Sequence, residues 1–398
     1  MSLRWAALSA ALLLAAAPAT RHSHYLFIWA EQARNPSAPD MSPRQGLGPA
    51  FIAAFDISPD VSPFGKLVAM RSTGTSALMV HHTNYALPPN DVLFANDWMA
   101  DRTYTFDLRD ASNPRLIAEF RNAGPYMYPH SFVYLSNGNT LATFQYTKGF
   151  NRSPGGLVEL DARGRVVKAS SAANPRVDPN IRPYSMAVIE RLDRVVTSSA
   201  DMMGAQTSRA VQIWRLSDLR LLRTLALPKP PDWYYDDAAD SSEPRLLSDG
   251  TTVVVPTFRC GLFLLRNLIG AAPALVHVYD FGYRLCEVPV IAGDYLVESA
   301  QSGHSIVSLD MHDPAHPREV SRLLLQPDEY PHWLALEPDG DRLVITGYGA
   351  LATRVLFATI DRATGALALE PQSISLTRSW PDGWQGAAIP HGAVFSNQ

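Results

Sequence analysis

Histidines that follow a proline, or stand as a pair, recur along this sequence at the start of similar segments. Pro-His dipeptides occupy positions 129–130, 331–332 and 390–391, and a His-His pair occupies positions 81–82. Neutral imidazole is a common ligand of copper, zinc and non-haem iron, and a set of imidazoles without thiolates suits Cu(II) or Zn(II). The candidate metal ligands are therefore His81, His82, His130, His332 and His391.

The elements that position these histidines form a repeated pattern. Residues 129–146 read PHSFVYLSNGNTLATFQY, and residues 331–348 read PHWLALEPDGDRLVITGY. Each segment has an apolar run, a turn and a second apolar run, which indicates paired β-strands. Segments with this pattern begin at intervals of roughly 40 to 60 residues, the repeat length of four-stranded propeller blades. The residues that open them are His82, His130, Tyr184, Glu243, Glu287, His332 and His391.

Seven openings predict an all-β fold, a seven-bladed β-propeller. The last of these residues, His391, belongs to the final strand of the sequence, PHGAVF. The seventh blade therefore needs strands from another part of the chain. The runs YLFIWA, FIAAFDI and KLVAMRS near the N-terminus can supply them, and this sharing closes the ring and hides the sheet edges. The competing arrangement is two separate β-sandwich domains, but no linker-like or low-complexity segment divides the chain.

The repeat also predicts where the functional residues meet. The inner strands begin at one mouth of the central channel, and four histidine-bearing blades are consecutive once the ring closes. We therefore expect their imidazoles to converge on one point. Glu243 and Glu287 open blades on the other side of the predicted ring. They could act as catalytic bases, serve as further metal ligands, or simply line the channel as polar residues. The alternative that the histidines only cap strands stays open at this point.

The second strands end at the same mouth of the channel, so residues there could contact a small substrate. The candidates for a substrate pocket are Asp97, Tyr146, Asp201, His304 and Tyr348. Cys260 and Cys286 fall at this mouth on neighbouring blades. In an exported protein such a pair favours a disulfide over a thiolate metal ligand.

The N-terminus has the features of an export signal. Arg4 precedes an apolar stretch too short to span a bilayer, and Ala17-Pro18-Ala19 gives a small-x-small cleavage pattern. We expect residues 1–19 to be a signal peptide, with residues 20–398 a single domain in the periplasm or secreted from a bacterium. The alternative is an uncleaved anchor.

Only 18% of residues are charged and the net charge is −4. Nucleic acid is therefore not an expected partner, and no membrane span is expected after signal cleavage.

These motifs resemble the selenium-binding protein/methanethiol oxidase family. The resemblance rests on the His-His pair, the next opening histidine, the late Pro-His, and the segments YLFIWA…FIAAFDISPD and VQIWRLSD…LLRTLAL. It implies a seven-bladed propeller and, by similarity to exported relatives, a copper enzyme that oxidises methanethiol with oxygen. The ligands it implies are His81, His82, His130 and His391. The chain departs from the family in lacking its cysteine pairs, which puts selenium binding in doubt, and in having His332.

Three functions fit the sequence. The first is a copper-dependent exported oxidase of a small thiol. The second is a metal-dependent hydrolase such as a lactonase, with zinc or calcium at the same mouth, where Glu243 and Glu287 would help more than in an oxidase. The third is a propeller that binds a small molecule without catalysis, since fold does not fix function.

Overall fold

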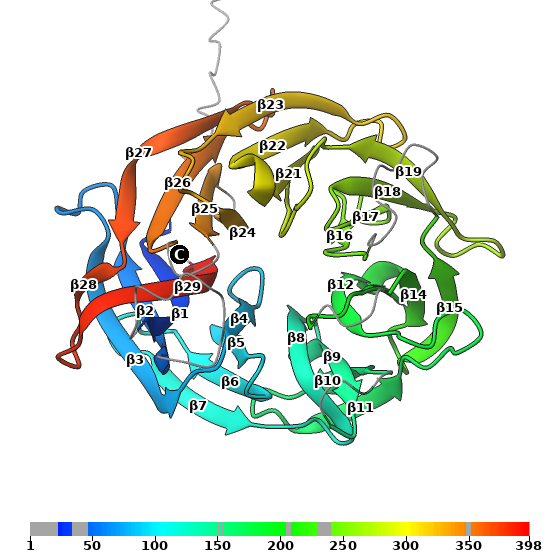
Figure 1. The fold of residues 1–398 in the computed structure, drawn as a ribbon, viewed down its shortest axis with the longest axis horizontal. Coiled ribbons are helices and arrows are strands. Elements are labelled where there is room, and N and C mark those ends of the chain that lie inside the picture. Colours follow the sequence, from blue (N-terminus) through cyan, green and yellow to red (C-terminus); the bar gives the residue numbers. More distant parts are fainter. Residues whose placement is uncertain are drawn as a thin grey trace, which may run out of the picture.

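The computed structural model is a ring of small β-sheets around a central channel (Figure 1). It describes residues 23–33, 47–149, 152, 154–203, 208–228, 240–338, 340–347 and 352–397. The described residues form seven sheets, six of four strands and one of five, and their helical residues are confined to two 3-10 turns, Glu190–Leu192 and Gln301–Gly303. The predicted seven-bladed β-propeller is therefore confirmed. The signal-peptide prediction for residues 1–19 lies outside the described residues.

Six blades are each built from four consecutive strands. The first three blades contain β4 (Val80–Thr83), β5 (Val92–Asp97), β6 (Arg102–Asp107) and β7 (Arg115–Phe120); β8 (Tyr126–Tyr134), β9 (Thr140–Thr147), β10 (Gly156–Leu160) and β11 (Val166–Ser171); and β12 (Pro183–Ile189), β13 (Arg194–Ser199), β14 (Ala210–Arg215) and β15 (Arg220–Ala226). The next three contain β16 (Arg245–Leu246), β17 (Val253–Pro256), β18 (Gly261–Arg266) and β19 (Ala274–Asp280); β20 (Val290–Ala292), β21 (Tyr295–Ala300), β22 (Ser305–Asp310) and β23 (Arg318–Leu324); and β24 (Pro331–Leu336), β25 (Arg342–Gly347), β26 (Arg354–Ile360) and β27 (Leu367–Ser375).

The seventh blade joins the two ends of the chain. Its strands are β28 (Thr377–Ser379), β29 (Gln385–Phe395), β1 (Tyr25–Ala33), β2 (Leu47–Asp56) and β3 (Lys66–Ser76), in that order across the sheet. Figure 1 shows the C-terminal β29 in red beside the N-terminal β1 in blue. The two strands are antiparallel, and Leu26 faces Phe395 across them. The prediction that N-terminal strands complete the last blade is thus confirmed.

Apolar side chains between adjacent blades hold the ring together. Strands in the middle of a blade are buried on both faces; Gly261–Leu265 of β18, for example, are all buried. Outermost strands alternate between exposed and half-buried residues, as along β7. One buried cluster joins Val211 and Ile213 of one blade to Val253 and Val255 of the next. Each fully buried aliphatic side chain stabilises the fold by about 1.5–3 kcal/mol, so packing between blades is a main source of the stability of the ring.

Five inner strands carry an irregularity at the residues predicted to open each repeat. The pairing register shifts between Val80 and Thr83, between Pro129 and Phe132, between Pro183 and Met186, between Pro331 and Trp333, and opposite residues 390–393 of β29. A β-bulge redirects side chains that regular pleating would alternate between two faces. The bulges therefore decide which residues reach the channel. In the part of the chain that the structure describes, no helix has the length and hydrophobicity to cross a membrane.

Candidate metal centre

Five histidines from four blades meet in the channel. His81 and His82 lie on β4, His130 on β8, His332 on β24 and His391 on β29, and all five are buried. Their blades are consecutive in the ring, because β29 stands between β24 and β4. The convergence that the sequence predicted is therefore present as geometry.

His81 and His82 both take part, although they are neighbours in one strand. Their rings stack with centroids 4.4 Å apart and planes 17° apart. In a regular strand, consecutive side chains point to opposite faces. The bulge between Val80 and Thr83 removes this alternation. Gly392 lets β29 approach: a Cβ at this position would lie 2.6 Å from Thr83 Oγ1.

The imidazoles are close enough to share metal ions. One ligand atom from each of His81, His82, His332 and His391 lies within 4.8 Å of every other. The ring centroids of His81 and His391 are 4.1 Å apart, and those of His332 and His391 are 4.4 Å apart. A second group with the same spacing joins His82, His130 and Glu243. The two groups share His82.

Burial keeps the histidines neutral, the form that binds metals. Burial is the main cause that holds the pKa of His81, His82, His130 and His391 well below its ordinary value. Neighbouring imidazoles lower it further, since two positive charges at this separation repel. Among the described residues, His81 Nδ1, His82 Nε2 and His130 Nε2 have no hydrogen-bond partner. Buried nitrogens without partners are unusual in proteins and fit a site built for an ion.

Glu243 stands beside this cluster on a network that the sequence did not reveal. Its Oε2 accepts hydrogen bonds from the hydroxyls of Tyr85 and Ser185 and from Arg245 Nη1, at 3.1 Å for the last. Its Oε1 lies 3.9 Å from His82 Nδ1. The guanidinium of Arg245 also lies 4.1 Å from the Tyr85 ring centroid. The carboxylate is therefore held by one oxygen while the other faces the histidines.

Aromatic rings wall the cluster. Trp333 stacks on Tyr85 with centroids 5.3 Å apart, and its ring meets His82 nearly edge-on at 5.1 Å. Tyr184 lies against His130 at 3.7 Å. Nothing in the sequence pointed to Tyr85, which forms hydrogen bonds with Ser131, Ser185 and Glu243 of three other blades.

A cavity of about 240 Å³ opens next to the histidines. His81 and His332 belong both to the cluster and to the lining of this cavity. The remaining lining is apolar and acidic and consists of Tyr184, Ala200, Asp201, Met202, Asp240, Phe258, Leu285 and Glu287. Glu287 Oε2 lies 3.5 Å from His332 Nδ1. Burial raises the pKa of Asp240 to about 7, helped by the charge of Asp201. The cavity gives a small molecule a place beside the imidazoles.

The predicted pocket residues differ in where they lie. Asp201 lines the cavity. Tyr146 lies behind it, buried, and its hydroxyl donates to Asp201 Oδ1 at 2.8 Å. Tyr146 is not among the residues that line this cavity but supports one of them, and a contact between Tyr146 and substrate stays a prediction. Tyr348 lies outside the described residues.

Asp97 and His304 do not line the cavity either. The two carboxylate oxygens of Asp97 accept the backbone N–H groups of Leu78 and Met79, so this residue anchors the segment before His81. His304 Nδ1 bonds to the carbonyl oxygen of Glu329 at 2.8 Å. In both cases the backbone, rather than a ligand, is the partner of the side chain.

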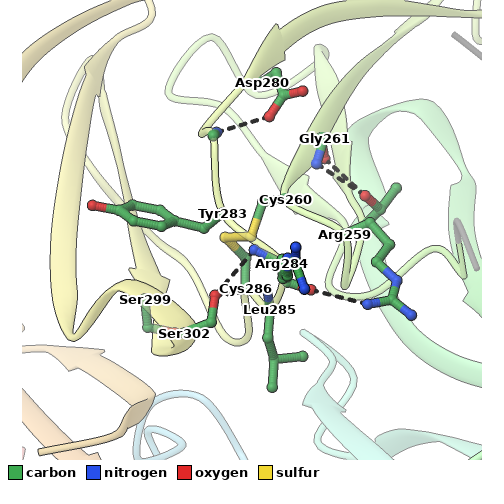
Figure 2. The surroundings of a disulfide bond; sticks show 12 residues. Arg259, Cys260, Gly261, Asp280, Tyr283, Arg284, Leu285, Cys286, Ser299 and Ser302 are labelled. Atoms are coloured by element: carbon green, nitrogen blue, oxygen red, sulfur yellow. Dashed lines mark hydrogen bonds between the residues drawn. A yellow bond between two sulfur atoms is a disulfide. The ribbon is translucent and has the colours of Figure 1, made fainter. Parts of the chain in front are cut away.

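The two cysteines, which lie on neighbouring blades, form a disulfide (Figure 2). Their Cα atoms are 5.0 Å apart, and both residues are buried. The backbone N–H of Cys286 donates to the carbonyl of Phe258 at 3.1 Å. Phe258 and Leu285, which adjoin this link, both line the cavity. The disulfide therefore fixes one wall of the cavity.

Comparison with known proteins gives similarity of structure and none of sequence. No protein-family model matches the chain, and no curated protein matches it in sequence. A hypothetical selenium-binding protein from Sulfolobus tokodaii is similar in structure, with 13% identity and a TM-score of 0.72 over 95% of this chain and 94% of that one. A periplasmic gluconolactonase from Pseudomonas aeruginosa has 13% identity and a TM-score of 0.62, covering 94% and 99% of the two chains. A putative 6-phosphogluconolactonase from Bacteroides fragilis has 10% identity and a TM-score of 0.60, covering 94% and 98%. At such identities the likeness shows the propeller fold, which this chain shares with a selenium-binding protein and with lactonases.

Proposed function

We propose that this protein is an exported, copper-dependent oxidase of a small thiol. The observation that carries the proposal is the convergence of His81, His82, His332 and His391, with ligand atoms all within 4.8 Å of one another. This group has only imidazoles, which suits Cu(II) or Zn(II), and burial lowers the pKa of His81, His82 and His391, which favours the neutral form that binds metals. Bound copper would supply the one-electron chemistry that links thiol oxidation to dioxygen.

The protein's own residues would prepare the site for such a substrate. Tyr184, Phe258, Leu285 and Met202 give the cavity an apolar surface that suits a small thiol. His81 and His332 border this cavity, so a molecule bound there is next to the imidazoles. Glu243, held by Tyr85, Ser185 and Arg245, can accept a proton close to His82.

The disulfide supports the proposed location outside the cytoplasm. Disulfides persist in the periplasm and in secreted proteins but are rare in the reducing cytosol. Cys260 and Cys286 are bonded in the structure. Cell fractionation, with sequencing of the mature N-terminus, tests this part of the proposal: cytoplasmic, full-length protein would contradict it.

The deciding experiment is metal and substrate analysis of protein exported from copper-supplemented cells. We expect about one or more equivalents of copper, a Cu(II) EPR signal typical of nitrogen ligands, and oxygen consumption with methanethiol. Matched preparations of His391→Ala serve as the control for adventitious copper. Less than a tenth of an equivalent of copper in the wild type would overturn the proposal.

A hydrolase is the second candidate, and two observations favour it. Gluconolactonase structures share the fold, and carboxylates of Asp201, Asp240 and Glu287 line the cavity, where they could handle protons or hold a hard cation. Zinc or calcium in the purified protein, no EPR signal, and hydrolysis of a lactone panel would establish this function instead. Retention of ligands without turnover in either assay would indicate a binding protein.

A further inference from the structure

We infer that the histidine cluster holds two metal ions, the second of them in a mixed site of His82, His130 and Glu243. This inference goes beyond the proposed function, which needs one ion. It starts from the second group of side chains, in which one ligand atom of each residue lies within 4.8 Å of the others. All three residues are buried, with at most 1% of their surface exposed.

Each member of the second group is held in place by hydrogen bonds to one of its atoms. The Ser131 hydroxyl lies 3.1 Å from His130 Nδ1 and 3.3 Å from His82 Nδ1, so a single side chain orients both rings. Glu243 Oε2 accepts three hydrogen bonds, as described above. Hydrogen bonds to the far atom of a ligand are what fix the ring orientation in metal sites.

The atoms left over have no hydrogen-bond partner among the described residues. They are His82 Nε2, His130 Nε2 and Glu243 Oε1. Burying a carboxylate oxygen without a hydrogen-bond partner costs free energy, and a bound cation would offset that cost. The ion pair with Arg245 Nη1 is made through Oε2 at 3.1 Å, so it leaves Oε1 without a hydrogen bond. Two imidazoles and one carboxylate are a common three-residue set for zinc, with a further position left for water or substrate.

The remaining histidines are sufficient for a first site. If His82 completes the second site, His81, His332 and His391 still provide three imidazoles. The ring of His81 lies 4.4 Å from that of His82 and 4.7 Å from that of His130, so the two sets are adjacent. Adjacent ligand sets are what a two-ion centre needs, because the metal pairs of enzymes are about 3.5–4 Å apart. Glu243 lies 3.9 Å from His82 and Glu287 lies 3.5 Å from His332, so each set of histidines has a carboxylate nearby.

Zinc binding to the metal-free full-length mature protein tests the inference, because zinc alone reports occupancy without any turnover. The protein is titrated with Zn²⁺ against a competing chelator that removes surface-bound ions, and bound zinc is then measured by elemental analysis. We expect two equivalents in the wild type and one in Glu243→Gln. The matched control is Glu298→Gln on β21, which removes another buried carboxyl that lies near Glu243 and Glu287 but belongs to neither ligand group. It should keep two equivalents.

Each result of the titration has one meaning. One equivalent in the wild type overturns the second site and leaves the single-ion function in place. No zinc also overturns the second site, and the copper analysis described above then decides the proposed function, because Cu(II) binds such sites more tightly than Zn(II). Two equivalents in folded Glu243→Gln also overturn the second site. If Glu243→Gln fails to fold, as judged by circular dichroism and thermal unfolding, His130→Gln takes its place with the same expected loss of one equivalent.

Discussion

The imidazole of His391 lies 4.1 Å from that of His81, although the two residues come from opposite ends of the chain. Their contact exists because β29 is paired with β1 and stands next to β4 in the closed ring. A metal ion can therefore bind to both residues only when the ring is closed. Conversely, the blades pack through their own apolar faces and do not need the metal to form.

Replacing His391 by alanine should remove the metal and leave the fold. Loss of a directly coordinating group is expected to cost more than the roughly 10–100-fold in affinity typical of residues that only support a ligand. Unfolding of the metal-free variant should stay close to that of the metal-free wild type, because interblade packing is unchanged. Elemental analysis and thermal unfolding measure the two effects. His304→Ala, which removes a histidine bonded to the Glu329 carbonyl, is the matched control and should retain the metal.

Replacing Asp97 by asparagine should weaken both folding and metal binding. Each carboxylate oxygen of Asp97 accepts one N–H, from Leu78 or Met79, and asparagine can accept with only one of its two atoms. The unpaired N–H should cost about 1–3 kcal/mol in unfolding free energy. The segment before His81 should also shift and lower metal affinity. Denaturant unfolding and metal titration measure these effects.

Asp101 supplies the control for this experiment. It accepts one backbone N–H, from Tyr128, through a single oxygen. Asparagine can keep this bond, so Asp101→Asn should bind metal as the wild type does. Equal metal affinity in Asp97→Asn and Asp101→Asn would contradict a positioning role for Asp97.

The buried carboxyl of Glu31 should make stability fall as pH rises. Burial raises its pKa to about 8 in the folded protein, although the hydrogen bond from the Val80 N–H opposes this. The unfolded chain titrates near 4.3, so between these values the folded state binds a proton that the unfolded state has lost. The stabilising contribution is complete below about pH 4 and is lost as the pH rises through 8. Glutamine keeps the acceptor oxygen and does not titrate.

The measurement is the difference in unfolding free energy between wild type and Glu31→Gln. Between pH 5.5 and pH 8.5 the unfolding free energy of the wild type should fall relative to that of the variant by about 3 kcal/mol, because one proton contributes about 1.4 kcal/mol per pH unit. Other titrating groups cancel in this difference. A constant difference across the range, or movement in the opposite direction, would show that Glu31 does not titrate as described.

Removing the disulfide should destabilise the protein and loosen the cavity while leaving the metal in place. The double variant Cys260→Ala/Cys286→Ala should lose about 2–4 kcal/mol of unfolding free energy. Because the link lies next to Phe258 and Leu285, KM for a substrate in the cavity should rise. Metal content should not change, since neither cysteine belongs to the groups of potential ligands. Urea unfolding, kinetics and elemental analysis separate the three effects, and reduced wild type is the control.

The sequence alone determined the fold and the ring of functional positions. Repeated openings at blade-length intervals, with only one strand left at the C-terminus, were sufficient to predict seven blades closed by N-terminal strands. Because every blade begins at the same mouth, the same repeat placed the histidines of consecutive blades together. Residue type and spacing carry this information, since turns and apolar runs are local properties of the chain.

Only the tertiary structure decided which side chains reach the centre and what they bond to. His81 and His82 both face the cluster because a bulge interrupts the pleating of β4, and that bulge depends on pairing with β5. Glu243 is held by residues of three blades, Asp97 bonds to backbone, and His304 turns to the Glu329 carbonyl. These orientations are set by hydrogen-bond partners distant in sequence and by local breaks in strand register. A pattern of period two cannot encode either, because a shift of one residue reverses the direction of every side chain.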